Sequence, residues 1–103
     1  MIRVTEAGDV SPGEMRVVDV AGTRVTIANV DGHLYAFEDR CTHRGCSLAS
    51  GELDGTLVTC ACHGSQFDVT SGAVLRGPAQ RPVRSFGLSV QDDQILVETP
   101  GAD

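Results

Sequence analysis

The sequence contains no lysine, and its eight basic residues are all arginine, scattered along the chain without a cluster. Fourteen acidic residues outnumber them, which gives a formal charge of −6. Nucleic-acid binding requires a basic stripe, so we expect no nucleic acid as partner. An acidic surface suits a carrier that meets a basic patch on its partner, and it equally suits simple solubility.

Long hydrophobic runs are also missing. Apolar runs such as Met15 to Ala21 and Gln94 to Val97 fall well below the roughly 18 to 20 residues that a bilayer span needs. The first residues, Met1 to Glu6, alternate like a strand and lack the pattern of a secretion signal. We therefore expect no membrane association and a cytoplasmic location.

Helical periodicity is nearly absent, whereas strand signals recur along the chain. Two-residue turns are expected at Ala21-Gly22 and Asp31-Gly32, which would join three strands into a meander. With 103 residues, the chain has room for one domain. Short strands with turns every eight to twelve residues predict an all-β sandwich or barrel of antiparallel strands. The expected strands are Met15 to Val20, Thr23 to Val30, Leu34 to Phe37, Thr56 to Thr59, Gln66 to Val69, Ala73 to Arg76, Val83 to Val90 and Gln94 to Thr99.

The segment from Arg40 to Ser65 differs from the rest of the chain. It contains all four cysteines and two of the three histidines, in two glycine-containing stretches without strand periodicity. Such stretches predict a functional site on loops that a β scaffold presents. The third histidine, His33, follows the Asp31-Gly32 turn, and we interpret it as an ordinary turn-flanking residue.

Several chemistries compete for these cysteines and histidines. Two structural disulfides would suit a small secreted domain but would leave the paired histidines without a role. A zinc site with two Cys and two His is chemically sound, although Cys41-x-His43 is spaced more tightly than zinc ligands usually are. A catalytic Cys-His pair would need only one thiol and would not explain the duplicated arrangement.

The runs CTHRGCSL (Cys41 to Leu48) and CACHGSQFD (Cys60 to Asp68) closely resemble the two cluster-binding loops of the Rieske family. In that family, C-x-H and C-x2-H motifs flank a spacer compatible with the one here. The resemblance implies that Cys41 and Cys60 bind one iron of a 2Fe-2S cluster, and that His43 and His63 bind the other. Neutral imidazoles in place of two thiolates remove two negative charges, which raises the reduction potential above that of a four-cysteine cluster.

Cys46 and Cys62 occupy the positions at which respiratory members of the family carry a disulfide between the two loops. A bond here would close a loop of about 17 residues and stabilise the region by roughly 3 kcal/mol in the chain-entropy model. A reducing cytoplasm disfavours such bonds. The resemblance therefore leaves a disulfide between Cys46 and Cys62 as an open prediction.

Other residues acquire roles from the same resemblance. Ser65 matches a position whose hydroxyl donates a hydrogen bond to a cluster sulfur, whereas Phe67 replaces a tyrosine that supplies a second donor in high-potential relatives. Pro78 matches a loop that covers the cluster, although an ordinary turn explains it nearly as well. Arg44 and Arg76 are candidates for a rim that contacts partners.

The resemblance extends over nearly the whole chain and implies an antiparallel β-sandwich with an inserted cluster-binding subdomain. We expect one Rieske domain over 1–103, with base sheets in 1–40 and 83–103 and the cluster-binding subdomain in 41–82. The expected function is a soluble, monomeric one-electron carrier, not an enzyme, that passes electrons from an NAD(P)H-dependent flavoprotein reductase to an aromatic-ring-hydroxylating oxygenase.

Two other functions stay open at this stage. One is a small subunit bound permanently to another oxidoreductase, such as a nitrite reductase or an arsenite oxidase, for which we would expect a large exposed apolar patch. The other is a zinc-stabilised interaction module, which would be colourless.

Overall fold

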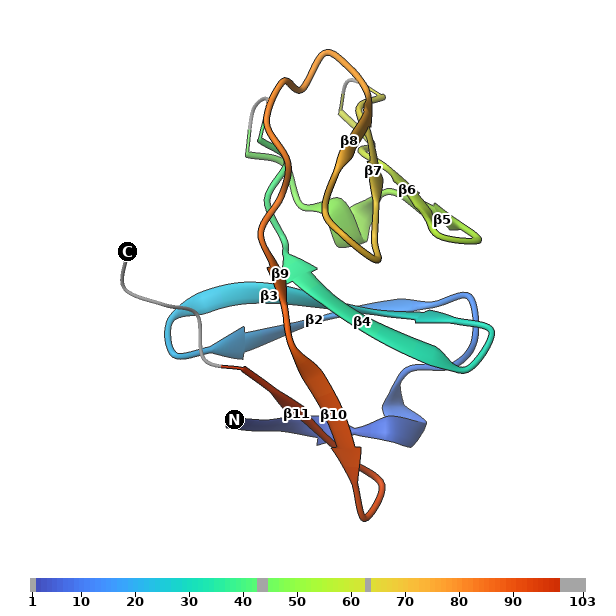
Figure 1. Cartoon of the computed structure of the whole chain (residues 1–103), viewed down its shortest axis with the longest axis vertical. Helices are drawn as coiled ribbons and strands as arrows, with labels where there is room; N and C mark the ends of the chain where they lie inside the picture. The colour runs from blue at the N-terminus through green and yellow to red at the C-terminus, as the bar shows by residue number, and fades with distance from the viewer. Residues whose placement is uncertain (1, 43–44, 63, 99–103) are drawn as a thin grey trace.

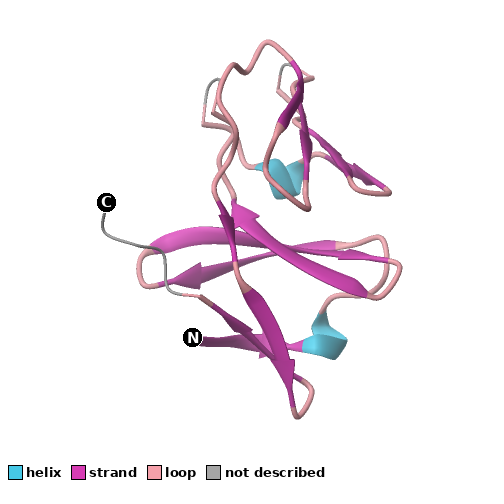
Figure 2. Ribbon diagram, viewed as in Figure 1, coloured by secondary structure: helices cyan, strands magenta, loops and turns pink. Residues whose placement is uncertain are grey.

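The computed structural model describes residues 2–42, 45–62 and 64–98. Within them the chain forms three antiparallel sheets, with strand orders β1-β11-β10, β2-β3-β4-β9 and β5-β6-β7-β8 (Figures 1 and 2). Two three-residue 3-10 helices complete the described structure, and neither is long enough to cross a membrane. The elements are β1 (Ile2–Glu6), η1 (Ala7–Asp9), β2 (Met15–Val20), β3 (Thr23–Val30), β4 (His33–Glu38), η2 (Leu48–Ser50), β5 (Glu52–Asp54), β6 (Leu57–Thr59), β7 (Gln66–Asp68), β8 (Val74–Arg76), β9 (Ser85–Phe86), β10 (Leu88–Gln91) and β11 (Gln94–Val97).

The all-β prediction is confirmed, and its first three strands follow from their turns. Ala21 and Gly22 both have positive φ angles, as do Asp31 and Gly32. Two consecutive positive φ angles define a tight turn whose twist matches that of the strands it joins. Strands β2, β3 and β4 therefore pair in sequence order, with Val20 opposite Thr23 and Val30 opposite His33.

One predicted strand is wrong in its extent, because the chain changes sheets within it. The segment Val83 to Val90 was expected to be continuous, but β9 pairs with β4 and β10 pairs with β11. Gly87 lies between them, and its carbonyl accepts a hydrogen bond from the backbone N–H of Glu98. Strand β5 was not predicted, since three residues with two acids give little strand signal.

Two apolar cores share strand β3. The base core lies between the β1-β11-β10 sheet and the β2-β3-β4 sheet and contains Val10, Val20, Val25, Ile27, Ala36, Ile95 and Val97. The upper core joins the β2-β3-β4 sheet to the β5–β8 sheet and contains Ala28, Phe37, Cys41, Leu48, Val58, Cys60, Phe67, Val69, Ala79 and Val83. Because β3 is buried on both faces, it joins the β5–β8 sheet on one side to the β1-β11-β10 sheet on the other. Each large side chain buried in this way contributes about 1.5–3 kcal/mol.

Asp39 fastens the same two parts through polar contacts. It follows β4, and its carboxylate accepts hydrogen bonds from the Thr26 hydroxyl in β3 (2.8 Å), from the Ser47 hydroxyl (2.7 Å) and from the Ala49 N–H (2.8 Å). The side chain is fully buried, and among the described residues it forms an ion pair of 3.5 Å with the exposed Arg24. The base sheet is thus hydrogen-bonded to the segment that follows Cys46.

Candidate metal centre

The first cysteine- and histidine-containing loop runs from Cys41 to Cys46 and closes on itself through two backbone hydrogen bonds. The N–H of Cys41 donates to the carbonyl of Cys46 (2.8 Å), and the N–H of Gly45 donates to the carbonyl of Cys41 (2.7 Å). Gly45 has a φ of +77°, which a residue with a side chain rarely adopts. The glycine therefore allows the tight closure that fixes the Cys41 end.

The second loop, from Cys60 to Ser65, closes through hydrogen bonds at the equivalent positions. The N–H of Cys60 donates to the carbonyl of Ser65 (2.8 Å), and the N–H of Gly64 donates to the carbonyl of Cys60 (3.1 Å). Gly64 has a φ of +79°. The two loops therefore form an equivalent pair, in which a cysteine begins each loop and a glycine stands four residues later.

The two equivalent cysteines point into the protein interior. Cys41 and Cys60 are each 2% exposed, belong to the upper core, and take part in no disulfide. Within the second loop, Ala61 and Cys62 are exposed. The construction thus keeps two thiols away from water at the first residue of each loop, while the residues that follow Cys60 reach the surface.

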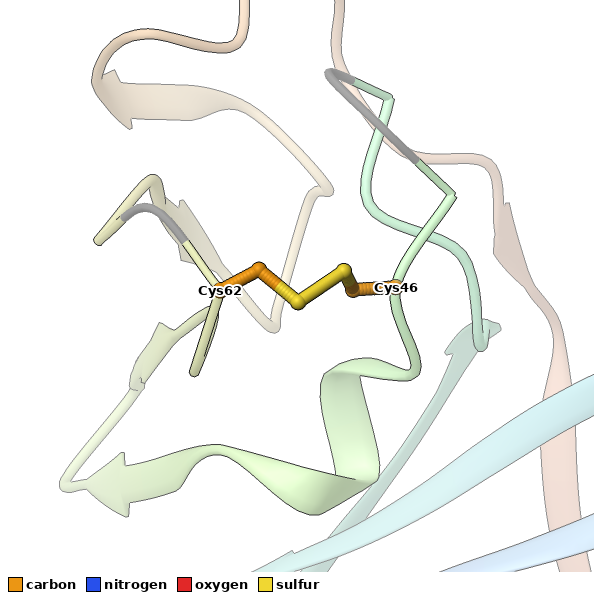
Figure 3. The surroundings of a disulfide bond; sticks show 2 residues. All are labelled: Cys46 and Cys62. Atoms are coloured by element: carbon orange, nitrogen blue, oxygen red, sulfur yellow. A yellow bond between two sulfur atoms is a disulfide. The ribbon is translucent and has the colours of Figure 1, made fainter.

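A disulfide joins the loops to each other, as Figure 3 shows. It links Cys46, at the end of the first loop, to Cys62, in the middle of the second, with their Cα atoms 6.5 Å apart. The sulfur of Cys60 lies within 4.8 Å of both bridged sulfurs. Because Cys46 and Cys62 are bonded to each other, neither can bind a metal in this form, and the thiols left for that role are Cys41 and Cys60.

The segment after β8 is hydrogen-bonded to both loops. The buried Ser65 hydroxyl oxygen accepts a hydrogen bond from the N–H of Ala79 (3.0 Å), and the Thr42 hydroxyl donates to the carbonyl of Arg81 (2.6 Å). Pro78, in a cis peptide bond with Gly77, immediately precedes the first of these two anchor residues, Ala79, in sequence. Since the Ser65 oxygen accepts one hydrogen bond, its own proton can be donated to another acceptor.

Several predicted site residues lie outside the described part of the chain. These are His43, Arg44 and His63, so the four-ligand set stays a prediction. Arg76 is exposed at the end of β8, and His33 is exposed at the start of β4, as expected for a turn-flanking residue.

Sequence reasoning missed two features beside the first loop. Asp39 precedes Cys41 by two residues, and a carboxylate immediately before a ligand loop was the only available signal. A cleft of about 640 Å³ also opens there, and no sequence pattern indicates it because residues about 40 positions apart form its walls. Its lining consists of Glu38, Arg40, Cys41, Thr42, Gly45, Arg81, Pro82, Val83 and Arg84.

The described residues fit the sulfur side of a 2Fe-2S cluster. Iron–sulfur clusters are held by thiolates, and hydrogen bonds and solvent exclusion tune their potentials. Two buried thiols on equivalent loops, a covalent tie between the loops and a buried hydroxyl beside them supply each of these elements. These residues would hold the iron that is bound by cysteine.

Comparison with known proteins places the chain among iron–sulfur proteins. Residues 1–87 match the family described as the Rieske [2Fe-2S] domain. The ferredoxin component of biphenyl 2,3-dioxygenase from Rhodococcus jostii is 31% identical over 98% of this chain and 94% of its own length. The biphenyl dioxygenase ferredoxin subunit of Pseudomonas sp. strain KKS102 is 36% identical over 87% of this chain and 84% of its own length.

Solved structures give the same result. The ferredoxin of carbazole 1,9a-dioxygenase from Nocardioides aromaticivorans superposes with a TM-score of 0.93 at 29% identity, covering 96% of this chain and 97% of that one. A chain from the complex of reduced oxygenase and oxidised ferredoxin in carbazole 1,9a-dioxygenase superposes with a TM-score of 0.89 at 34% identity. That match covers 94% of this chain and all of the other.

Proposed function

The chain belongs to the family of Rieske [2Fe-2S] domains, and we propose that it carries single electrons to a terminal oxygenase that hydroxylates aromatic rings. The relatives reported above are ferredoxin components of biphenyl and carbazole dioxygenase systems, and they match this chain over nearly its whole length. The observation that carries the proposal is the pair of equivalent loops, each with a buried thiol, joined to each other by a disulfide.

The ligands in this proposal are Cys41 and Cys60 for one iron, and His43 and His63 for the other. A bound cluster supplies one-electron exchange, and no acid, base or nucleophile of the chain is needed for it. The residues of the upper core keep water away from the thiols, because Cys41 and Cys60 lie among fully buried Phe and Leu side chains. Desolvation of this kind and neutral imidazole ligands both tune the potential of the bound group.

The partners follow from the relatives. One solved relative comes from a complex of an oxygenase with its ferredoxin, and this supports a terminal oxygenase as electron acceptor. We further propose a flavin-dependent ferredoxin reductase as donor, a cytoplasmic location and a monomeric state. Aromatic hydrocarbon catabolism is the process that these assignments imply.

A permanent subunit of another oxidoreductase is the alternative, and the distribution of exposed apolar residues disfavours it. In the described part of the chain, large hydrophobic side chains are exposed only at Ile2, Leu75 and Val90. Ile2 and Val90 lie on the two outer strands of the β1-β11-β10 sheet, whereas Leu75 lies in β8 of a different sheet. Scattered residues of this kind support an exchangeable carrier, because obligate interfaces are larger and more apolar.

The ligand assignment is tested by substitution in the iron-loaded protein. His43→Cys is expected to change the visible spectrum and lower the reduction potential, since it restores a negative thiolate. Cys60→Ser should abolish or remodel the cluster. His33→Cys is the matched control, because His33 is exposed and far from both loops in sequence. Unchanged iron content and an unaltered spectrum in the first two variants would show that these residues are not ligands.

The electron-carrier role is tested by reconstitution with the reductase and oxygenase of the R. jostii biphenyl dioxygenase system. We expect NADH-dependent formation of hydroxylated biphenyl only when this chain is added. We also expect the reductase alone to reduce this chain, which is followed as a change in its visible absorption. A chain that contains a cluster but is neither reduced by the flavoprotein nor oxidised by the oxygenase would contradict the proposed role.

A further inference from the structure

Charge is distributed unevenly along the chain. Residues 40–84, which include both loops and the β5–β8 sheet, contain five Arg and three acidic residues, for a formal charge of +2. The remaining 58 residues contain three Arg and eleven acidic residues, for a formal charge of −8. The chain is therefore acidic because of its base, whereas the part that carries the loops is weakly basic.

The cleft beside the first loop concentrates this positive charge. Its charged residues are Arg40, Arg81 and Arg84 with one carboxylate, Glu38, which gives a local formal charge of +2. Arg40 and Arg81 flank the loop from two segments that are distant in sequence. Arg81 also lines a second hollow with Thr42 and Pro78, so it lies where the segment after β8 meets the first loop.

Two of the three guanidinium groups in this cleft have no ionic partner within the described chain. Arg84 lies 3.8 Å from the Glu38 carboxylate, and its guanidinium stacks at 5.3 Å from the Phe86 ring centroid. Arg40 and Arg81 are exposed and form no ion pair with any residue that the structure describes. Their positive charge is therefore available to an external carboxylate.

Salt screens the charges at one end of the molecule from a partner at the other end. Its longest dimension is 39 Å, and it runs from the β5–β8 sheet at the top of Figure 1 to the β10–β11 turn at the bottom, which contains Asp92 and Asp93. The Debye length is about 10 Å at 0.1 M ionic strength. A partner that approaches the loops therefore experiences mainly the nearby arginines, and the acidic base is screened.

We propose that the face formed by Arg40, Arg81 and Arg84 beside the first loop docks a carboxylate-bearing surface of the partner protein. The proposal rests on the electron-carrier function and adds the chemistry of its recognition. An acidic patch around the partner's electron entry point would be attracted to this face, and this attraction brings the loops toward the partner. Such complementarity acts mainly on the association rate.

Small redox ions test the sign of the potential at this face. The reduced protein is mixed with ferricyanide, an anion that takes up one electron and becomes ferrocyanide, or with tris(phenanthroline)cobalt(III), a cation that takes up one electron and becomes cobalt(II). Between 50 and 500 mM salt, the ferricyanide rate should fall by about tenfold, as for opposite charges, and the cobalt rate should rise. The reverse slopes would overturn the proposal, because they would mean that the net charge of −6 governs the encounter.

Matched charge reversals locate the effect. Arg81→Glu lowers the local charge of the cleft from +2 to zero, so the salt dependence with ferricyanide should disappear. Arg16→Glu, on the exposed face of β2 in the base, changes the net charge by the same amount and should leave the slope unaltered. Arg40→Glu provides a second variant should Arg81→Glu fail to fold. Equal effects of the base and cleft variants would overturn the assignment of the face.

A hexaglutamate peptide tests the class of partner. It should slow oxidation of the wild-type protein by ferricyanide, and it should have no effect on Arg81→Glu, whereas a hexaarginine peptide should not compete. Competition by hexaarginine alone would overturn the proposal. A failure of the carrier function itself would be distinguishable, because it would appear in the reconstitution with the reductase and oxygenase, whereas the ferricyanide and cobalt rates need only a reducible chromophore.

Discussion

Removal of the Asp39 carboxylate is expected to destabilise the protein by several kcal/mol. Asp39 is buried and accepts three hydrogen bonds, from the hydroxyls of Thr26 and Ser47 and from the N–H of Ala49. Asp39→Ala leaves these donors without their acceptor in the interior. The Ala49 N–H is fixed by the backbone and cannot turn away, whereas the hydroxyls can rotate.

The magnitude follows from the contacts. Each hydrogen bond to a charged group contributes about 1.5–3 kcal/mol, and disruption of a buried charged network costs about 3–5 kcal/mol in total. The ion pair with Arg24 adds little, because the Arg24 side chain is 66% exposed and exposed pairs contribute about 0–1 kcal/mol. For a domain of this size, 1 kcal/mol corresponds to roughly 4–8 °C in Tm, so Asp39→Ala should lower the Tm by at least about 12 °C.

The assay follows thermal loss of visible absorption together with the far-ultraviolet circular dichroism. The scan rate is held constant, because irreversible loss of metal makes the apparent Tm depend on it. Asp39→Asn should lie between wild type and Asp39→Ala, since the amide keeps one acceptor oxygen. Arg24→Ala is the control and should shift the Tm by only a few degrees, and Thr26→Val removes one donor without changing the shape.

A specific result would refute this reasoning. If Asp39→Ala and Arg24→Ala shifted the Tm equally, the carboxylate would contribute no more than an exposed charge. The buried hydrogen bonds between the base sheet and the segment after the first loop would then not fasten the two parts of the molecule.

Three further predictions concern the loops and the segments beside them. Gly51→Ala should destabilise the protein by at least about 2 kcal/mol, because the added Cβ would lie 1.9 Å from a backbone carbonyl oxygen. Gly8→Ala is the control, since a Cβ at Gly8 has no neighbour within 4 Å, and urea unfolding compares the two variants. Ser65→Ala should lower the reduction potential measured by voltammetry, since a hydrogen-bond donor is lost, while Ser65→Thr should retain most of it. Cys46→Ser with Cys62→Ser should leave iron bound but lower stability by about 3 kcal/mol; iron analysis and denaturation measure the two effects, and loss of iron would contradict this expectation.

The strands that local sequence specifies were predictable, and those that depend on distant partners were not. Asp31-Gly32 adopts two positive φ angles, which its residue types favour, so the pairing of β3 with β4 could be predicted from the turn between them. Gly87, by contrast, divides a run that looks continuous, because the first half pairs with β4 and the second with β11. No property of the run itself reveals which strand will lie beside it.

The site shows the same division. The cysteines of the two loops were evident from the motif, whereas the disulfide between Cys46 and Cys62, which the structure contains, was an open prediction from the resemblance. The arginine cleft could not be predicted. Arg40 and Arg81 approach the first loop from opposite ends of the inserted segment, and only the fold brings them together.

The two loops have equivalent backbone hydrogen bonds, but their last residues are held by different kinds of bond. The last residue of the first loop, Cys46, forms a covalent bond to the second loop, whereas its equivalent in the second loop, Ser65, is hydrogen-bonded to the backbone of Ala79. The disulfide therefore holds the loops to each other, and the Ser65–Ala79 hydrogen bond holds the segment after β8 against the second loop. Because each loop also closes through its own two backbone hydrogen bonds, reduction of the disulfide should relax the distance between the loops while each loop keeps its shape and its thiol.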